Sequence, residues 1–271
     1  VRMSKYNIMS NNLTIKGKNF NPKLTTVSDK PSVMDSGAKY VYVGYNGKNL
    51  ILQTPKMYIP FGMNVYDKGE YPKYSVELSF QGMDDDKSLR AFHDNIMAFD
   101  DVLVEAGLKN STSWFKKKKA SKEVIAALFN PQLKVPTDKD TGEELTQYPK
   151  RLRLKIPFKN DKFECEFYDT GKNKLTDPIE DILVKGATGK AIIQCVGLWI
   201  SSSNYMCQWK LVRMEVDVPQ TAKNIDFLPD TDDEDEDNES SRPTTNDKPS
   251  NFVEDDDDDE DDDDDDDDDD D

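Results

Sequence analysis

The sequence predicts a mainly β fold, which we expect to be a closed or nearly closed antiparallel barrel with a helical insertion and an acidic tail. About seven segments alternate apolar and polar residues with the period of two that is typical of strands, and helices do not alternate regularly with them. Helical three-four spacing appears in two segments, both within residues 84–130. Apolar residues nearly vanish from residue 226 onward.

The charge divides the 271-residue chain into two unlike parts. Residues 226–271 contain 28 acidic and two basic residues, a net charge of −26, and finish in eleven consecutive aspartates. Residues 1–225 contain 34 basic and 26 acidic residues, a net charge of +8. A segment so poor in apolar residues buries too little surface to offset the entropy lost on ordering. We therefore expect a basic folded body and a disordered acidic tail over residues 226–271.

The composition argues against several classes of protein. The sequence has no run of about 18 apolar residues, which a membrane span needs, and its first ten residues lack the apolar core of a signal peptide, so we expect a soluble intracellular protein. Cys165, Cys195 and Cys207 are odd in number and show no CxxC spacing, so neither a disulfide framework nor a zinc site is indicated. The single histidine, His93, argues against most His-dependent chemistry. No histidine, nucleophile or phosphate loop accompanies the clusters of acidic residues, which indicates a non-enzyme without metal or cofactor.

The first part of the chain contains three predicted strands. Residues 1–38 are polar and are expected to form an N-terminal arm or a weak edge strand. Alternating residues over 39–45 and 49–54 flank Asn-Gly, a favoured two-residue turn, and predict a β-hairpin. Residues 74–80 alternate again and predict the third strand.

The helical insertion follows over about residues 84–130. Three aspartates at 84–86 place negative charge at a helix start, apolar residues then recur at three-four spacing, and Gly107 suits a helix C-cap. A second, shorter helix is predicted over residues 121–129, where Asn130-Pro131 stops it.

Four further strands are predicted to close the body. They cover residues 151–158, 163–168, 191–201 and 205–218. Together with the hairpin and the third strand, they define a barrel domain over residues 39–225.

A basic strand face is the first candidate binding feature. Arg151, Arg153 and Lys155 alternate with apolar residues, so an extended strand places the three cations about 6 to 7 Å apart on one side, close to the phosphate repeat of an extended nucleic-acid strand. A solvated face with ion pairs is the alternative, because a turn over residues 158–163 sets Lys155 against Glu166.

Aromatic residues beside cations are the second feature. Proteins that hold single strands without reading their sequence stack bases on aromatic rings and follow the backbone with Lys and Arg. Many of the body's 24 aromatic residues are also needed in the core, and the tetra-lysine run is equally typical of a phosphate-contacting loop, a nuclear-localisation patch or a solubilising surface. The candidate nucleic-acid-binding residues are Lys56, Tyr58, Lys73, Tyr74, Trp114, Lys116, Lys117, Lys118, Lys119, Arg151, Arg153, Lys155, Trp199, Trp209, Lys210 and Arg213.

The acidic tail is the third feature. A polyanion tethered to a basic body has an effective concentration of order millimolar, so the tail is expected to mimic a phosphate backbone and to compete with nucleic acid for the same cations. It is also suited to recruit basic partner proteins. A generic solubility or spacing tail, or a loose sink for divalent cations, is the alternative interpretation.

Several motifs together resemble a known family. They are residues 53–62 (QTPKMYIPFG), the strand 74–80, Gly-Leu-Trp at 197–199 and Trp-Lys at 209–210, followed by the aspartate-rich tail. In this combination the chain resembles the replication single-stranded-DNA-binding proteins of the bacteriophage T-seven type, and more closely their relatives in nucleocytoplasmic large DNA viruses. The resemblance covers about residues 39–218 and the tail.

The resemblance implies an OB-fold that binds single-stranded DNA without strong sequence preference during viral DNA replication, recombination or repair. It further implies that the tail contacts replication proteins, that a homodimer is an option, and that the protein works at the viral replication site in the host cell, in the nucleus or the cytoplasm, with packaging in the virion left open. The alternative function is that of an acidic chaperone or virion assembly protein, which binds basic partners such as histones or capsid components through the tail.

Overall fold

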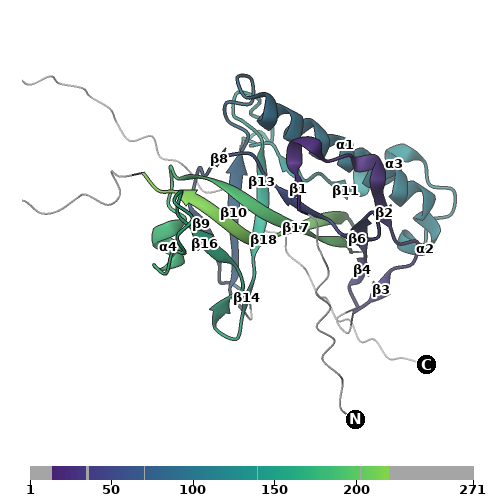
Figure 1. Ribbon diagram of the computed structural model, residues 1–271. Coiled ribbons are helices and arrows are strands. Elements are labelled where there is room, and N and C mark those ends of the chain that lie inside the picture. Colours follow the sequence, from purple (N-terminus) through teal and green to yellow (C-terminus); the bar gives the residue numbers. More distant parts are fainter. Residues whose placement is uncertain (1–13, 35–36, 70, 139, 202, 220–271) are drawn as a thin grey trace, which may run out of the picture.

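The computed structural model describes residues 14–34, 37–69, 71–138, 140–201 and 203–219. The first 13 residues of the expected arm and the predicted disordered tail, residues 226–271, lie outside the described residues. Within them the chain is mainly β with one helical insertion, which confirms the predicted fold class (Figure 1).

Five strands pair in a ring. They are β8 (Met57–Tyr58), β10 (Lys73–Ser79), β13 (Arg151–Ile156), β18 (Tyr205–Asp217) and β17 (Thr188–Ile200), in that order around the ring, and β17 pairs again with β8. The β13–β18 pair is parallel, and the other pairs are antiparallel.

The ring is not closed by continuous ladders. The β8–β10 link is the single pair Ser79 and Tyr58, and the β13–β18 link is the single pair Lys155 and Lys210. A five-stranded, partly open barrel of this kind is OB-fold-like.

Shorter strands extend the ring. They are β1 (Ile15–Lys16), β3 (Ser32–Val33), β4 (Lys39–Val41), β7 (Ile51–Gln53), β9 (Met63–Tyr66), β11 (Phe129–Asn130), β12 (Leu133–Lys134) and β16 (Glu166–Tyr168). A separate three-stranded sheet contains β2 (Thr25–Val27), β5 (Val43–Tyr45) and β6 (Lys48–Asn49), and a separate hairpin contains β14 (Phe158–Lys159) and β15 (Lys162–Phe163).

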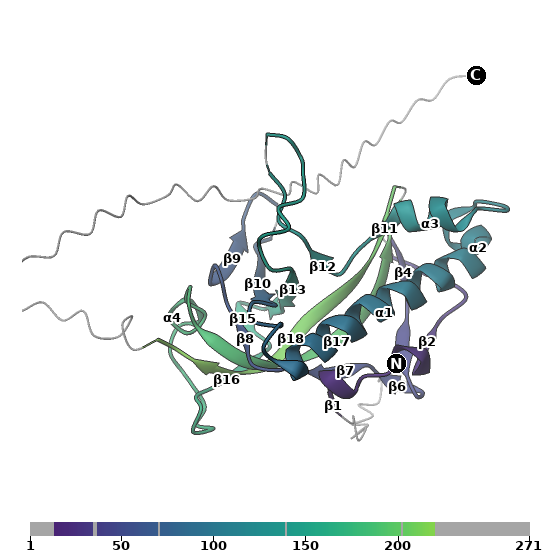
Figure 2. The ribbon, with the colours of Figure 1, turned by 90° about the horizontal axis from the view of Figure 1, so that it is seen from above.

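The helices are α1 (Lys87–Lys109), α2 (Ser111–Phe115), α3 (Lys122–Leu128) and the short α4 (Ile179–Ile182), with 3₁₀ turns at Gly17–Asn19 and Pro22–Leu24. Helices α1, α2 and α3 run together along one side of the molecule (Figure 2).

Helix α1 begins where the sequence predicts. The side chain of Asp86 accepts hydrogen bonds from the backbone N–H groups of Ser88 and Leu89, which satisfies two donors that the helix leaves free. The predicted C-cap at Gly107 is wrong, because the helix continues to Lys109. Gly107 is instead a packing contact, since a Cβ atom there would lie 2.6 Å from the hydroxyl of Tyr205.

Part of the expected N-terminal arm packs on the barrel. Strand β1 pairs in parallel with β7, which agrees with the expected weak edge strand. Phe20 is buried and lies edge-on against Phe99 of α1, with the ring centroids 5.4 Å apart. Residues 14–33 therefore contribute to the same hydrophobic core as the barrel.

The two longest strands present one face to the core and the other away from it. In β18 the odd-numbered residues from Tyr205 to Leu211 are buried, whereas Lys210 and its even-numbered neighbours are partly exposed. The pairing of β17 with β18 shifts by one residue between Ile192 and Ile193. Because of this shift, buried residues of β17 stay opposite buried residues of β18 on both sides of it. We call the side of β10, β13, β17 and β18 that points away from the core the outer face.

Within the described residues, no helix combines the length and the apolar character that crossing a membrane requires.

Candidate nucleic-acid interface

Strand β13 places three cations on the outer face. Leu152, Leu154 and Ile156 are buried, so the alternating Arg151, Arg153 and Lys155 point the other way, as the sequence predicts.

The strand register continues this row across four strands. Ser75 of β10 pairs with Lys155 of β13, Lys155 pairs with Lys210 of β18, and Lys210 pairs with Gln194 of β17. Paired residues lie on the same side of a sheet, and neighbouring strands are about 4.8 Å apart, so the four side chains form a row of about 15 Å across the outer face. We call this row of four residues the cation row, after its two central lysines.

The two lysines of the cation row have no acidic partner. Among the described residues, no carboxylate lies within ion-pair distance of Lys155 or Lys210, and Lys155 is exposed. Arg153 lies beside them and donates from Nε to the hydroxyl of Ser75 at 3.3 Å. Adjacent unpaired cations repel each other, so this part of the surface favours a bound anion.

Other predicted cations are already paired. Arg151 Nε lies 3.1 Å from Glu77 Oε2, and both side chains are 13% exposed. Arg213 donates to Glu166 at 2.5 Å, and its guanidinium lies over the ring of Tyr168. These arginines hold the sheet together, and their positive charge is largely neutralised.

The predicted turn is correct, because Phe158 pairs with Phe163. The ion pair that it was expected to produce, between Lys155 and Glu166, is absent among the described residues. Glu166 contacts Lys174 and Arg213 instead, and their hydrogen bonds lower the pKa of its carboxyl to about 2. Lys155 therefore stays available to a ligand.

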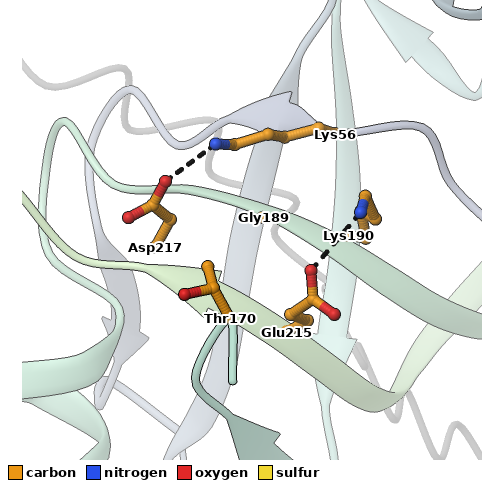
Figure 3. A pocket seen from close by; sticks show the side chains of 6 residues that line it. All are labelled: Lys56, Thr170, Gly189, Lys190, Glu215 and Asp217. Carbon is orange, nitrogen blue, oxygen red and sulfur yellow. Dashed lines mark hydrogen bonds and ion pairs between the residues drawn. The ribbon is translucent and has the colours of Figure 1, made fainter. Parts of the chain in front are cut away.

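A small pocket lies where β17 begins and β18 ends (Figure 3). Its volume is about 270 Å³, and it is lined by two ion pairs, Lys56–Asp217 at 2.8 Å and Lys190–Glu215 at 3.4 Å. Lys56, a predicted binding residue, is thus balanced by an acid. The pocket carries no excess charge that would attract a phosphate.

Trp199 lies on the outer face at the other end of the hairpin. It is partly exposed, and its ring meets Tyr40 of β4 edge-on at 5.7 Å. The Tyr40 hydroxyl donates to the backbone oxygen of Val196 at 2.5 Å, and burial raises its pKa. The hydrogen bond fixes Tyr40, which in turn supports the indole of Trp199 as a platform on which a base can stack.

Tyr66 is a candidate that the sequence reasoning missed. It pairs with Lys73 across β9 and β10, so both lie on the same side as Ser75 and Lys155. The ring of Tyr66 is 39% exposed, and Lys73 Nζ lies 5.6 Å from its centroid. The alternation of residues 63–66 could have placed it, because β9 is short but regular. The exposed Tyr66 thus lies near the β10 end of the cation row, and the partly exposed Trp199 lies on the same face, five residues along β17 from Gln194.

Two predicted aromatic residues belong to the core. Trp209 is 2% exposed and donates from Nε1 to the side-chain oxygen of Gln132, and Trp114 is fully buried and donates to the backbone oxygen of Asp29 at 3.3 Å. Neither indole can stack on a base in this conformation, so the prediction was wrong for both.

Tyr74 is also misplaced as a partner of Lys73, because consecutive strand residues point to opposite faces. Its ring lies in an aromatic cluster with Phe158 and Phe163, with centroid distances of 5.0 and 4.9 Å. Tyr58 is partly buried and forms the single β8–β10 link with Ser79.

A buried polar cluster holds the barrel to the helices. Gln132, between β11 and β12, donates from Nε2 to Asp100 Oδ1 at 2.5 Å and accepts from Trp209. Burial raises the pKa of the Asp100 carboxyl to about 6, although the hydrogen bonds from Gln132 oppose this shift. This cluster fixes the strand that carries Lys210.

The lysine run, residues 116–119, lies away from the cation row. It follows α2, whose Trp114 and Phe115 pack against Tyr205 on the core side of β18. All four lysines are exposed. Among the described residues, no group of three or more His, Cys, Asp and Glu side chains is placed to hold a metal ion.

Comparison with known proteins finds distant similarities. No family model matches the chain. An uncharacterized protein of Acanthamoeba polyphaga mimivirus, L291, is 25% identical over 173 residues, which are 62% of this chain and 26% of that protein. The chain thus matches about a quarter of that relative's length.

Among solved structures, the single-stranded DNA-binding protein of bacteriophage Enc34 in complex with ssDNA aligns with a TM-score of 0.37 and 12% identity, covering 69% of this chain and 94% of that one. The single-stranded DNA-binding protein gp2.5 of bacteriophage T7 aligns with a TM-score of 0.38 and 12% identity, covering 67% and 97%. Similarity at these TM-scores does not establish function, which has to be argued from the outer face of this chain.

Proposed function

We propose that this chain is a non-catalytic, non-sequence-specific single-stranded-DNA-binding protein that holds the strand on its outer face. The proposal rests on Lys155 and Lys210, which lie side by side on neighbouring strands and have no acidic partner among the described residues. The exposed Tyr66 and the partly exposed Trp199 lie on the same face.

The side chains divide the work of binding. Lys155, Lys210 and Arg153 contact phosphates, and Trp199 and Tyr66 stack on bases, each stack being worth about 1 to 3 kcal/mol. Every base has a flat face, so stacking does not read sequence. A duplex keeps its bases stacked inside, so it gains the phosphate contacts alone and binds less tightly.

The acidic tail regulates this binding in our proposal. Its charge of −26 competes with phosphates for the unpaired cations of the outer face. When DNA displaces it, the tail is released for basic replication proteins. We place this activity in viral DNA replication, recombination or repair at the viral replication site. The similarity to a mimivirus protein supports the viral origin alone. The homodimer stays a prediction, which the molar mass of the full chain from light scattering tests.

A binding titration tests the proposal. The hydrophobic core lies within residues 14–219, so a protein ending at Ile225 keeps all of the described packing. We expect this tailless protein to bind labelled oligo-dT more tightly than the full chain, and duplex DNA less tightly than oligo-dT. The slope of log affinity against log salt should be about −0.7 per phosphate contacted. Failure of the tailless protein to bind oligo-dT at low salt would refute the function.

The acidic chaperone remains the second candidate, because the tail's charge suits it to basic proteins. Pull-down of histones with the full chain and the tailless protein separates the two. Binding of basic proteins that is lost with the tail, together with no oligo-dT binding by the body, favours the chaperone.

A further inference from the structure

A second cationic surface lies outside the proposed DNA site. We call residues 116–119 the lysine loop. Its four lysines are exposed, and no ion pair engages them among the described residues. Lys116 and Lys119 adopt φ angles of 55° and 56°, so the loop turns sharply between α2 and α3. Four neighbouring unpaired cations on one turn make a locally positive surface that attracts anions at low salt.

The lysine loop lacks what a single strand of DNA needs besides charge. Trp114 is buried, and Phe115 is partly buried with its ring 5.0 Å from that of Tyr205. No exposed aromatic ring therefore lies beside the loop within residues 110–120. The surface suits a polyanion without bases, whereas the outer face offers stacking platforms as well as cations.

The lysine loop is also separated in space from the Tyr66 end of the outer face. Helices α2 and α3 lie at the opposite end of the molecule from β9 and β10, as Figures 1 and 2 both show. Trp114 and Phe115 pack on the core side of β18, whereas Lys210 points to the outer face. A strand bound between Tyr66 and Lys210 therefore leaves the lysine loop uncovered. Trp199 lies nearer to α2, because Lys39, which pairs with the neighbouring Ile200, donates to the backbone oxygen of Trp114 at 2.8 Å.

We propose that the acidic tail of this same chain, residues 226–271, docks on the lysine loop. Charge complementarity supports this occupant, because the tail carries −26 and contains two basic residues in all. The reach is sufficient, since the 52 residues after residue 219 span up to about 170 Å when extended. Tethering raises the local concentration of the tail above that of any free polyanion of equal affinity.

Docking on the loop opposes competition at the DNA site. A tail segment held by the lysine loop is not on the cation row, so the loop draws tail away from the outer face. This consequence for DNA rests on the proposed function, whereas the docking itself does not. Removing the loop's charge shifts the tail toward the cation row, because a ligand distributes between sites according to their relative affinities.

Zero-length cross-linking tests the docking directly. A carbodiimide couples lysine amines to carboxylates in contact, and mass spectrometry of the monomer band identifies the coupled lysines. In the full chain at low salt we expect tail carboxylates coupled to Lys117 and Lys118 more often than to Lys159 and Lys162, which form a matched pair of exposed lysines on the β14–β15 hairpin. Coupling to the loop no greater than to that control pair would overturn the proposal.

A double variant tests the regulatory consequence. K117Q/K118Q removes two charges without touching the strained φ positions, and K159Q/K162Q removes the same charge elsewhere. In the full chain, we expect K117Q/K118Q to weaken oligo-dT binding by about twofold or more beyond the control variant. In the tailless protein, K117Q/K118Q should match the control variant.

The remaining outcomes are distinct. An equal loss in the full chain and the tailless protein means that the loop contacts DNA directly, which overturns tail docking. No loss beyond the control in either protein overturns the regulatory role. If the tailless protein does not bind oligo-dT at all, the proposed function fails, and the cross-linking result still decides whether the tail docks on the loop.

Discussion

Lys155 and Lys210 are direct partners across the parallel strands β13 and β18, and theirs is the single residue pair that joins these two strands. Like charges directly opposite each other in a sheet are destabilising. Repulsion between the two lysines therefore weakens the contact between β13 and β18, and an anion bound between the lysines would relieve this repulsion.

The first prediction concerns this pair. K155Q/K210Q should weaken oligo-dT binding by the tailless protein by about tenfold at low salt, and should make the salt slope shallower by about 1.4, or 0.7 for each lost phosphate contact. Fluorescence anisotropy over a salt series measures both quantities.

K56Q/K190Q is the matched control, because it removes the same charge from lysines that are paired with Asp217 and Glu215. Its salt slope should stay close to that of the unchanged protein. Equal effects of the two double variants would show that net charge alone, and not the cation row, determines binding.

The second prediction concerns the three tryptophans. Oligo-dT should quench the fluorescence of the partly exposed Trp199, whereas Trp114 and Trp209 are buried and hydrogen-bonded in the core. W199F should abolish the quenching, and W199L, which removes the aromatic ring, should weaken binding by about 1 to 3 kcal/mol. Quenching that persists undiminished in W199F would contradict the assignment.

The third prediction concerns Tyr66. Y66L should weaken oligo-dT binding by about 1 to 3 kcal/mol, because it removes a stacking ring and the contact with Lys73. Y148L, at an exposed tyrosine in the loop before β13, is the control and should bind normally. A titration in which the two variants bind alike would remove Tyr66 from the interface.

The fourth prediction concerns pH. The pKa of Asp100 is raised from 3.8 to about 6 by burial, so the folded chain holds this proton more tightly than the unfolded chain. The contribution of Asp100 to the free energy of unfolding therefore falls as pH rises through about 4 to 6, by about 1 kcal/mol between pH 5 and pH 7.

The side chain of D100N cannot titrate. The difference in free energy of unfolding between D100N and the unchanged protein should therefore change by about 1 kcal/mol between pH 5 and pH 7. Urea unfolding at pH 5 and pH 7 measures it. A difference that does not vary with pH would mean that Asp100 titrates normally in the folded protein.

The sequence predicted the regular elements well because their patterns are local. The alternation over residues 151–158 matches β13, and helix α1 starts at its predicted acidic cap. The position of Arg151, Arg153 and Lys155 on one face follows from the period of a strand alone.

The site was harder to predict because proximity in sequence does not mean a shared surface. Trp209 and Lys210 were taken together, as were Lys73 and Tyr74, yet neighbours in a strand point to opposite faces. The pairing of Lys155 with Lys210, and of Tyr66 with Lys73, depends on strand register across the sheet. No local pattern determines which of the many cations meets an acid, as Arg213 meets Glu166.

The bridge that Gln132 forms between Asp100 and Trp209 has a consequence for protein engineering. The inserted helices look like a cassette that a designer could excise to obtain a minimal barrel. Excision of the helices would remove Asp100, the residue that holds Gln132 in place. The buried hydrogen bond from Trp209 to Gln132, on the core side of the strand that carries Lys210, would then lose its support. The smallest autonomous version of this protein must therefore retain its helices.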